Sequence, residues 1–140
     1  MGPGGVVGTK FAWPDYGPKL SDVYLTAQKE EHWKKWIGLY NQKMLSRGNF
    51  RNLYVYGYDS PEGYAIEKDG VMHYAFFATK APDNSEPAKW AGEIELRGLM
   101  PGVYRVFDYA DNRDLGTVTA PNAKLTTSFS DHLLLQVSRQ

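Results

Sequence analysis

The fold of this chain is decided by the stretch Tyr64-Ala65-Ile66-Glu67-Lys68-Asp69-Gly70-Val71-Met72-His73-Tyr74. The Asp69-Gly70 dipeptide favours a two-residue β-hairpin turn, because both residue types tolerate positive φ angles. The residues on either side are rich in apolar and aromatic side chains, as in strands that pack on a core. The stretch therefore predicts an antiparallel hairpin near the middle of the chain.

Further strand-like segments surround this hairpin. Ile94 and Leu96 alternate with Glu93 and Glu95, which is the pattern of an antiparallel strand with one solvated face. The candidate strands are 50–56, 63–67, 71–78, 90–97, 102–109, 115–119, 124–129 and 132–138. Short strands separated by turn residues predict a mainly β fold, an antiparallel β-sandwich of about seven or eight strands.

One N-terminal amphipathic α-helix is predicted ahead of the strands, over residues 26–47. Thr26 suits the N-cap of this helix, and Gly48 suits the position just beyond its end. One helical face collects the large apolar side chains, which are Trp33, Trp36, Ile37, Tyr40 and Met44. We expect this face to lie across a sheet or between two domains.

Chain length and the distribution of glycine and proline predict the domain organisation. Residues 1–25 are rich in glycine and proline, which predicts a loop or linker. Residues 26–140 are predicted to form the helix and the β-sandwich. A chain of 140 residues is long enough for one such domain without a disulfide or metal to stabilise it.

Charge and composition argue against several classes of function. Lys+Arg and Asp+Glu both number 16, so the zero net charge favours neither nucleic acid nor an anionic membrane as partner. Because the chain has no cysteine, it has no disulfide, cysteine–zinc site or thiol nucleophile. No apolar run approaches the roughly 18 residues of a membrane span. Residues 1–20 lack the pattern of a signal peptide.

No constellation of residues predicts catalysis, a metal site or a cofactor. Glu93 and Glu95 would lie roughly 7 Å apart on one strand face, the size of separation seen in glycosidases. Alternating glutamates are equally typical of any solvated strand. An acidic cluster has oxygen ligands suited to calcium, but it fits a turn better: Asp108, Asp111, Asn112 and Asp114. The three histidines are scattered and lack metal-ligand spacing.

Aromatic residues make up 14% of the chain, and they fit two interpretations. Rings at helical or strand spacing are most simply core anchors, whereas rings near loops can stack on sugars. The candidates for sugar contact are Trp13, Tyr16, Tyr56, Tyr58 and Trp90.

Several stretches together resemble a known group of proteins, the bacterial α-galactosidase-like (melibiase-type) glycoside hydrolases, in their C-terminal region. They are Glu31 to Asn41, Lys43 to Ser46, Tyr58 to Gly63, His73 to Phe77, Glu95 to Gly102, Tyr104 to Tyr109, Arg113 to Gly116 and His132 to Leu135. The stretch Gly8-Thr9-Lys10-Phe11 is similar to the tail of the catalytic barrel in that family.

The resemblance implies a β-sandwich that follows a catalytic (β/α)₈ barrel in a parent chain. In that family two barrel aspartates hydrolyse α-galactosides, and no residue here matches their motifs. The expected function is therefore a noncatalytic accessory domain, either in the bacterial cytoplasm or exported with its parent enzyme. Two alternatives stay open: a carbohydrate-binding module that recognises α-galactoside sugars, and a protein-interaction domain.

Overall fold

The computed structural model describes residues 25–79 and 88–140, and half of them lie in strands. Helix α1 spans Ala27–Lys43, and a short 3₁₀ turn follows at Leu45–Arg47. The strands are β1 (Asn49–Arg51), β2 (Glu62–Lys68), β3 (Val71–Phe77), β4 (Lys89–Glu95), β5 (Gly102–Asp108), β6 (Arg113–Ala120), β7 (Lys124–Ser130) and β8 (His132–Arg139). The predicted class, a mainly β antiparallel sandwich with one helix near its start, is confirmed.

The two sheets are unequal in size. The larger has six strands in the order β1-β2-β3-β8-β5-β6, and the smaller pairs β4 with β7. All of these pairings are antiparallel. The predicted hairpin is the β2–β3 pair, in which Lys68 lies opposite Val71. Asp69 and Gly70 form its turn with φ angles of 53° and 75°, as a two-residue turn of this kind requires.

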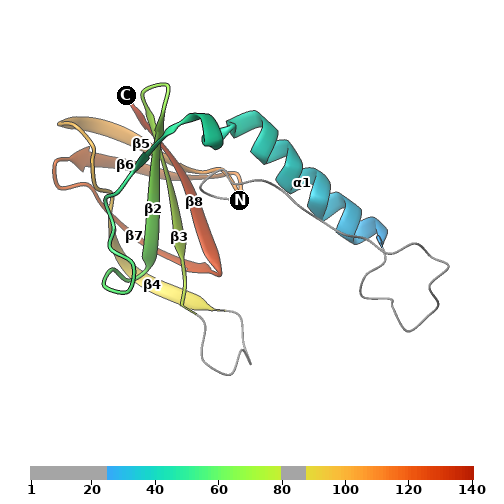
Figure 1. The fold of residues 1–140 in the computed structure, drawn as a ribbon. Coiled ribbons are helices and arrows are strands. Elements are labelled where there is room, and N and C mark those ends of the chain that lie inside the picture. The colour runs from blue at the N-terminus through green and yellow to red at the C-terminus, as the bar shows by residue number, and fades with distance from the viewer. Residues whose placement is uncertain (1–24, 80–87) are drawn as a thin grey trace.

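The main core lies between the two sheets (Figure 1). The inner face of the large sheet supplies most of it, including Tyr74, Phe76, Val106, Leu133 and Leu135, all almost fully buried. Strands β4 and β7 close this core from the other side with smaller contributions. These strands show the predicted alternation, since Ile94 is buried while its neighbours in sequence are exposed.

The second face of the large sheet is covered only in part, by α1 and by the turn after β5. A small cluster forms there around the buried residues Ala75, Tyr109 and Leu134, with Trp36 and Leu39 of the helix packed against it. Strands β3 and β8 are consequently buried on both faces over most of their length. Figure 1 shows α1 beside the sandwich, with its N-terminal end pointing away from the sheets.

The end of the helix differs from the prediction. The N-cap is Thr26, whose side chain accepts a hydrogen bond from the backbone N–H of Lys29 at 3.3 Å. However, α1 stops at Lys43, and Met44 rather than Gly48 adopts the left-handed conformation, with φ of 44°. This early turn places Leu45 in the protein interior, where it is 5% exposed. Tertiary burial therefore overrides the local glycine signal.

The segment predicted as strand 50–56 is also different. Its first two residues belong to β1, and the rest forms an irregular loop that leads to β2.

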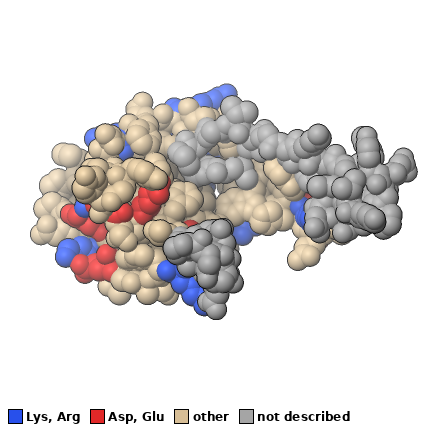
Figure 2. Space-filling view, turned by 60° about the horizontal axis from the view of Figure 1, so that its bottom comes forward, with Lys and Arg blue, Asp and Glu red and all other residues tan. Residues whose placement is uncertain are grey.

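In the described residues, no helix is both long enough and apolar enough to cross a membrane. Figure 2 shows one side of the molecule, where acidic and basic side chains of the described residues lie close together among uncharged ones.

Candidate functional site

The loop between β1 and β2 displays the two most exposed large hydrophobic side chains among the described residues, Tyr58 and Tyr56. Tyr58 is 89% exposed, Tyr56 is 78% exposed and Val55 is 58% exposed. Gly57 separates the two tyrosines with φ of 79°, a conformation that glycine adopts without strain. The carbonyl of Val55 accepts hydrogen bonds from the backbone N–H groups of Tyr58 and Asp59, at 3.1 and 3.0 Å. The tip is therefore an ordered turn.

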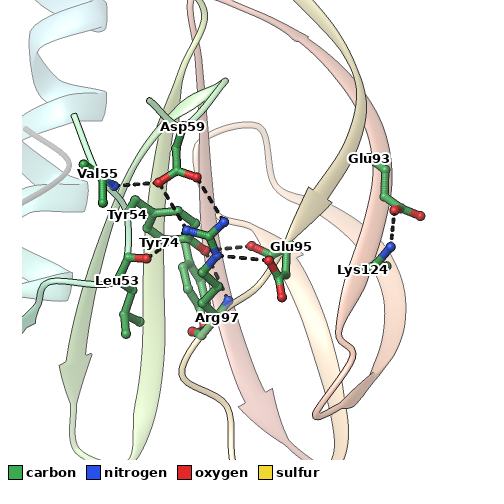
Figure 3. A network of polar contacts seen from close by, with 9 residues as sticks. All are labelled: Leu53, Tyr54, Val55, Asp59, Tyr74, Glu93, Glu95, Arg97 and Lys124. Carbon is green, nitrogen blue, oxygen red and sulfur yellow. Dashed lines mark hydrogen bonds and ion pairs between the residues drawn. The ribbon is translucent and has the colours of Figure 1, made fainter. Parts of the chain in front are cut away.

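A network of polar contacts fixes the base of this loop (Figure 3). The Arg97 guanidinium donates two hydrogen bonds to the Asp59 carboxylate, Nη2 to Oδ1 at 3.0 Å and Nη1 to Oδ2 at 3.2 Å. It also donates to the Leu53 carbonyl and to Glu95, each at 3.0 Å. The second Asp59 contact closes the loop, because Oδ2 accepts from the Val55 backbone N–H at 2.6 Å. One arginine thus links the loop to the end of β4.

Two tyrosines, the half-buried Tyr54 and the buried Tyr74, attach this network to the core. Tyr54 donates from its hydroxyl to the Glu95 carbonyl at 2.8 Å, and the Arg97 guanidinium lies 5.0 Å from the centre of its ring. Tyr74 donates to the Arg97 carbonyl at 2.6 Å. Burial raises the pKa of both tyrosines, so their hydroxyls stay protonated donors.

Asp59 is held as a carboxylate ion at the base of this loop. The hydrogen bond from the Val55 backbone N–H, and then those from Arg97, lower the pKa of Asp59. Hydrogen bonds to Asp59 and Glu95 raise the pKa of Arg97. Glu93 pairs with Lys124 at 2.7 Å and Glu95 pairs with Arg97 at 3.0 Å, both on the exposed face of β4. Each glutamate therefore pairs with a cation, which Glu95 shares with Asp59, an arrangement suited to holding structure rather than to moving protons.

A second feature, an open depression of about 620 Å³, lies at the opposite end of β4. Trp90 is one of its lining residues; its half-buried side chain packs against the main core and stacks on Phe129 with 5.6 Å between ring centres. The indole also lies against Gly92, where an added Cβ would come within 3.0 Å of the ring. The polar lining of the depression comes from several elements and includes Asp111, Arg113, Ser128, Ser130 and His132.

The turn after β5 organises one wall of this depression. Asp108 is 1% exposed and accepts hydrogen bonds from the backbone N–H groups of Ala110 and Asp111, at 3.1 and 3.3 Å. Its other carboxylate oxygen accepts from Arg113, at 2.8 Å from Nη2 and 3.3 Å from Nε. Asp108 is thus the residue that shapes this turn. No group of three or more metal-ligating side chains occurs in the two ranges that the structure covers.

The five residues predicted for sugar contact do not form one platform. Trp13 and Tyr16 lie outside the described residues. Tyr56 and Tyr58 share the exposed loop, whereas Trp90 lies at the start of β4. The loop network meets β4 at Glu95, five residues further on, roughly 17 Å along an extended strand. The structure therefore contains two separate candidate surfaces.

Sequence reasoning missed the residues that build these surfaces. Arg97 and Asp59 are 38 positions apart, so their pairing has no local signal. Asp108 and Arg113 are close in sequence, and the acidic cluster did indicate a turn there. The arginine that satisfies the buried carboxylate was the missing part of that prediction.

Comparison with known proteins gives one relative of high similarity. The chain is 40% identical over 115 residues to an A type blood alpha-D-galactosamine galactosaminidase of Flavonifractor plautii. The match covers 80% of this chain and 10% of the relative, so the chain spans about a tenth of that protein's length. No family model matches the sequence.

Among solved structures, one similar chain is described as an alpha-N-acetylgalactosaminidase from Bacillus halodurans. Its identity to this chain is 18%, its TM-score is 0.49, and the match covers 73% of this chain and 24% of that one. The sequence relationship over most of this chain confirms the resemblance to part of a glycoside hydrolase. This β-sandwich chain is therefore homologous to a segment of a galactosaminidase.

Proposed function

We propose that the chain is a noncatalytic accessory domain of a glycoside hydrolase and that α1 packs against the catalytic domain of a longer polypeptide. The observation that carries this proposal is that α1 contains no buried residue, although one of its faces is apolar. The relative in which this segment occurs is about ten times longer than the segment. The resemblance implies that the partner is a (β/α)₈ barrel.

The orientation of the helix supports this proposal. Trp36, Leu39 and Lys43 face the sheet, since they are spaced by three and four positions. Ile37 lies about 100° further round the helix than Trp36 and is 41% exposed. One flank of the apolar stripe is thus uncovered by the sandwich. An exposed apolar flank of this kind is typical of a surface that meets another domain.

The charges of the described residues support a noncatalytic role. The strand carboxylates that suggested a glycosidase pair are neutralised by Lys124 and Arg97 on an open surface. A retaining glycosidase instead needs two carboxyl groups in different environments within a cleft. The parent enzyme is proposed to act on a glycan with an α-linked galactose or galactosamine unit.

Activity assays test the first half of the proposal. The purified chain should release no nitrophenol from nitrophenyl α-galactoside or nitrophenyl N-acetyl-α-galactosaminide. Turnover that persists through purification and disappears on substitution of Glu93 or Glu95 would overturn the noncatalytic assignment.

Matched helix variants test the second half. In the isolated chain, Ile37→Ser and Glu31→Ser should each change the unfolding free energy by no more than about 0.5 kcal/mol, because both side chains are exposed. In a polypeptide that carries the domain beside its catalytic domain, Ile37→Ser should shorten the thermal half-life of activity, and Glu31→Ser should not. Equal half-lives of the two variants would contradict packing through this flank.

A further inference from the structure

We propose that Glu62, Tyr64 and Tyr56 bind the ammonium group of an amino sugar where the β1–β2 loop joins the large sheet. Glu62 and Tyr64 are two residues apart on β2, so their side chains share one face of the strand. This is the outer face of the sheet, which α1 covers only in part. The choice of a sugar among ammonium compounds rests on the proposed function, in which the parent enzyme acts on galactose or galactosamine units.

Glu62 differs from the other strand carboxylates because no cation balances it. The Tyr64 hydroxyl donates a hydrogen bond to Glu62, and no Lys or Arg of residues 25–79 and 88–140 forms an ion pair with it. Glu67, also half-buried on β2, pairs instead with Arg51. A carboxylate has about four acceptor sites. Glu62 therefore keeps both charge and acceptor capacity for a cationic ligand.

Aromatic rings lie beside this carboxylate. Phe77 is directly opposite Glu62 in the register of β2 and β3, and its ring meets that of Tyr64 edge to face with 6.0 Å between centres. The hydrogen bond to Glu62 raises the pKa of Tyr64, and the phenol of Tyr56 lies near enough to add to this shift. Aromatic faces carry partial negative charge, so they attract an ammonium group in the same way as the carboxylate does.

The groups of this site are accessible to a ligand. Tyr56 is 78% exposed, while Glu62 and Tyr64 are half-buried. The backbone that carries Tyr56 is fixed in advance, because Asp59 and Arg97 hold the base of its loop. A fixed backbone loses little conformational entropy on binding. An amino sugar can therefore place its ammonium group at Glu62 and its apolar C–H face against Tyr56.

The charge of the site selects among sugars. The unbalanced carboxylate of Glu62 attracts a protonated amine, whereas an acetylated amine or a hydroxyl carries no charge to be attracted. Ion pairs and cation–π contacts near the surface are weak individually. We therefore expect a dissociation constant in the millimolar range for galactosamine and weaker binding of galactose and N-acetylgalactosamine.

Sugar titration at constant ionic strength tests this site. Galactosamine hydrochloride, added to the isolated chain up to about 100 mM against matched sodium chloride, should give saturable amide shifts that gather at Glu62 and Tyr64. Galactose and N-acetylgalactosamine should bind at least about fivefold more weakly. Absence of saturation with galactosamine, or equal affinity for the three sugars, would overturn the proposal.

A simple amine distinguishes an amino sugar from the other source of an ammonium group, a lysine side chain of a protein. n-Butylammonium chloride mimics the lysine side chain and lacks the sugar ring. It should bind more weakly than galactosamine, because it cannot cover Tyr56 with the face of a ring. Equal or tighter binding of n-butylammonium would refute the assignment to a sugar and favour a protein partner.

Two glutamates of β2 give a matched pair of variants. Glu62→Gln keeps the size of the side chain and the acceptor for the Tyr64 hydroxyl but removes the charge. It should raise the dissociation constant for galactosamine by about fivefold or more, whereas Glu67→Gln should change it by less than about twofold, because Arg51 already neutralises Glu67. Similar effects of the two substitutions would contradict a role for Glu62.

Two tyrosines of the loop give a second pair that does not depend on the stability of the strand. Tyr56→Ala should raise the dissociation constant for galactosamine by about three- to fivefold, the size of one exposed cation–π contact. Tyr58→Ala, at the other exposed ring, should change it by less than about twofold. A larger effect of Tyr58→Ala would place the ligand elsewhere on the loop and overturn the site.

A variant of the helix separates this proposal from the accessory role. Ile37→Ser should leave the dissociation constant for galactosamine unchanged, because Ile37 belongs to α1 and not to the site at the start of β2. Failure of galactosamine binding would therefore leave the packing of α1 on a catalytic domain untouched, and the converse holds as well.

Discussion

At the scale of single residues, His73 is the buried ionisable group whose environment most clearly opposes its charge. It lies on β3 on the face toward α1, is 8% exposed, and its Nδ1 has no hydrogen-bond partner among the described residues. Burial, and then the charge of Lys43, lower the pKa of His73 from 6.5 to about 4. The folded chain therefore holds this imidazole neutral throughout the physiological range.

The depressed pKa of His73 predicts a specific loss of stability in acid. Between pH 6.5 and about 4 the unfolded chain binds this proton and the folded chain does not, so the contribution is complete above pH 6.5 and falls as the pH falls toward 4. The loss should reach about 3 kcal/mol at about 1.4 kcal/mol per pKa unit. Urea unfolding of the wild type and of His73→Leu across this range measures it.

The control for this prediction is His32→Leu, since His32 is an exposed residue of α1. The pH dependence of unfolding should flatten in His73→Leu and stay as in the wild type in His32→Leu. Identical pH profiles for the wild type and His73→Leu would show that the charge on His73 does not limit stability in acid.

Two glycines with open space around them should respond oppositely to alanine. Gly38 lies within α1 and Gly57 has φ of 79°, and an added Cβ meets nothing within 4 Å at either position. Gly38→Ala should strengthen α1 by about 0.5–1 kcal/mol, seen as greater helical circular dichroism on warming. Gly57→Ala should destabilise the loop by about 1–2 kcal/mol through backbone strain alone. A stabilising effect of Gly57→Ala would contradict the left-handed conformation there.

At the scale of elements, local signals predicted most of the fold. The Asp69-Gly70 turn and the alternation around Ile94 are properties of neighbouring residues, so their strands could be located from the sequence. The end of α1 could not be located from the sequence. Met44 adopts the left-handed conformation there, and this buries Leu45 against residues that are distant in sequence.

The candidate surfaces were predictable only in part, for the same reason. The exposed tyrosines of the β1–β2 loop were singled out by residue type, but the loop is fixed by Arg97, which belongs to another part of the chain. Trp90 was likewise singled out without Arg113, which lines the same depression and is held by Asp108. Residue type indicates what a side chain can do, whereas tertiary contacts decide which side chains act together.

At the scale of the whole molecule, the chain divides into a sandwich with a continuous core and a helix held at its side. The sandwich buries large rings and aliphatic groups between its sheets, whereas α1 has no buried residue. The contacts that hold α1 to the sheet come from its second half, where Trp36 meets the His132 ring at 5.2 Å and the Lys43 ammonium lies 5.0 Å from the centre of the Tyr109 ring. A helix of 17 residues has little stability without such packing.

This division predicts two levels of stability in hydrogen exchange. Amides of residues 28–35 should exchange at least about a hundredfold faster than those of β3 and β8, because local opening of the helix leaves the core intact. Trp36→Ala should remove the protection of α1 without altering that of β8, while Glu31→Ala should change neither. Uniform protection of α1 and β8 would mean that the helix is an integral part of the sandwich. When a catalytic domain is joined to the chain, the difference in exchange rate between α1 and β8 should become smaller. This change would indicate that the exposed flank of α1 at Ile37 has become part of an interface.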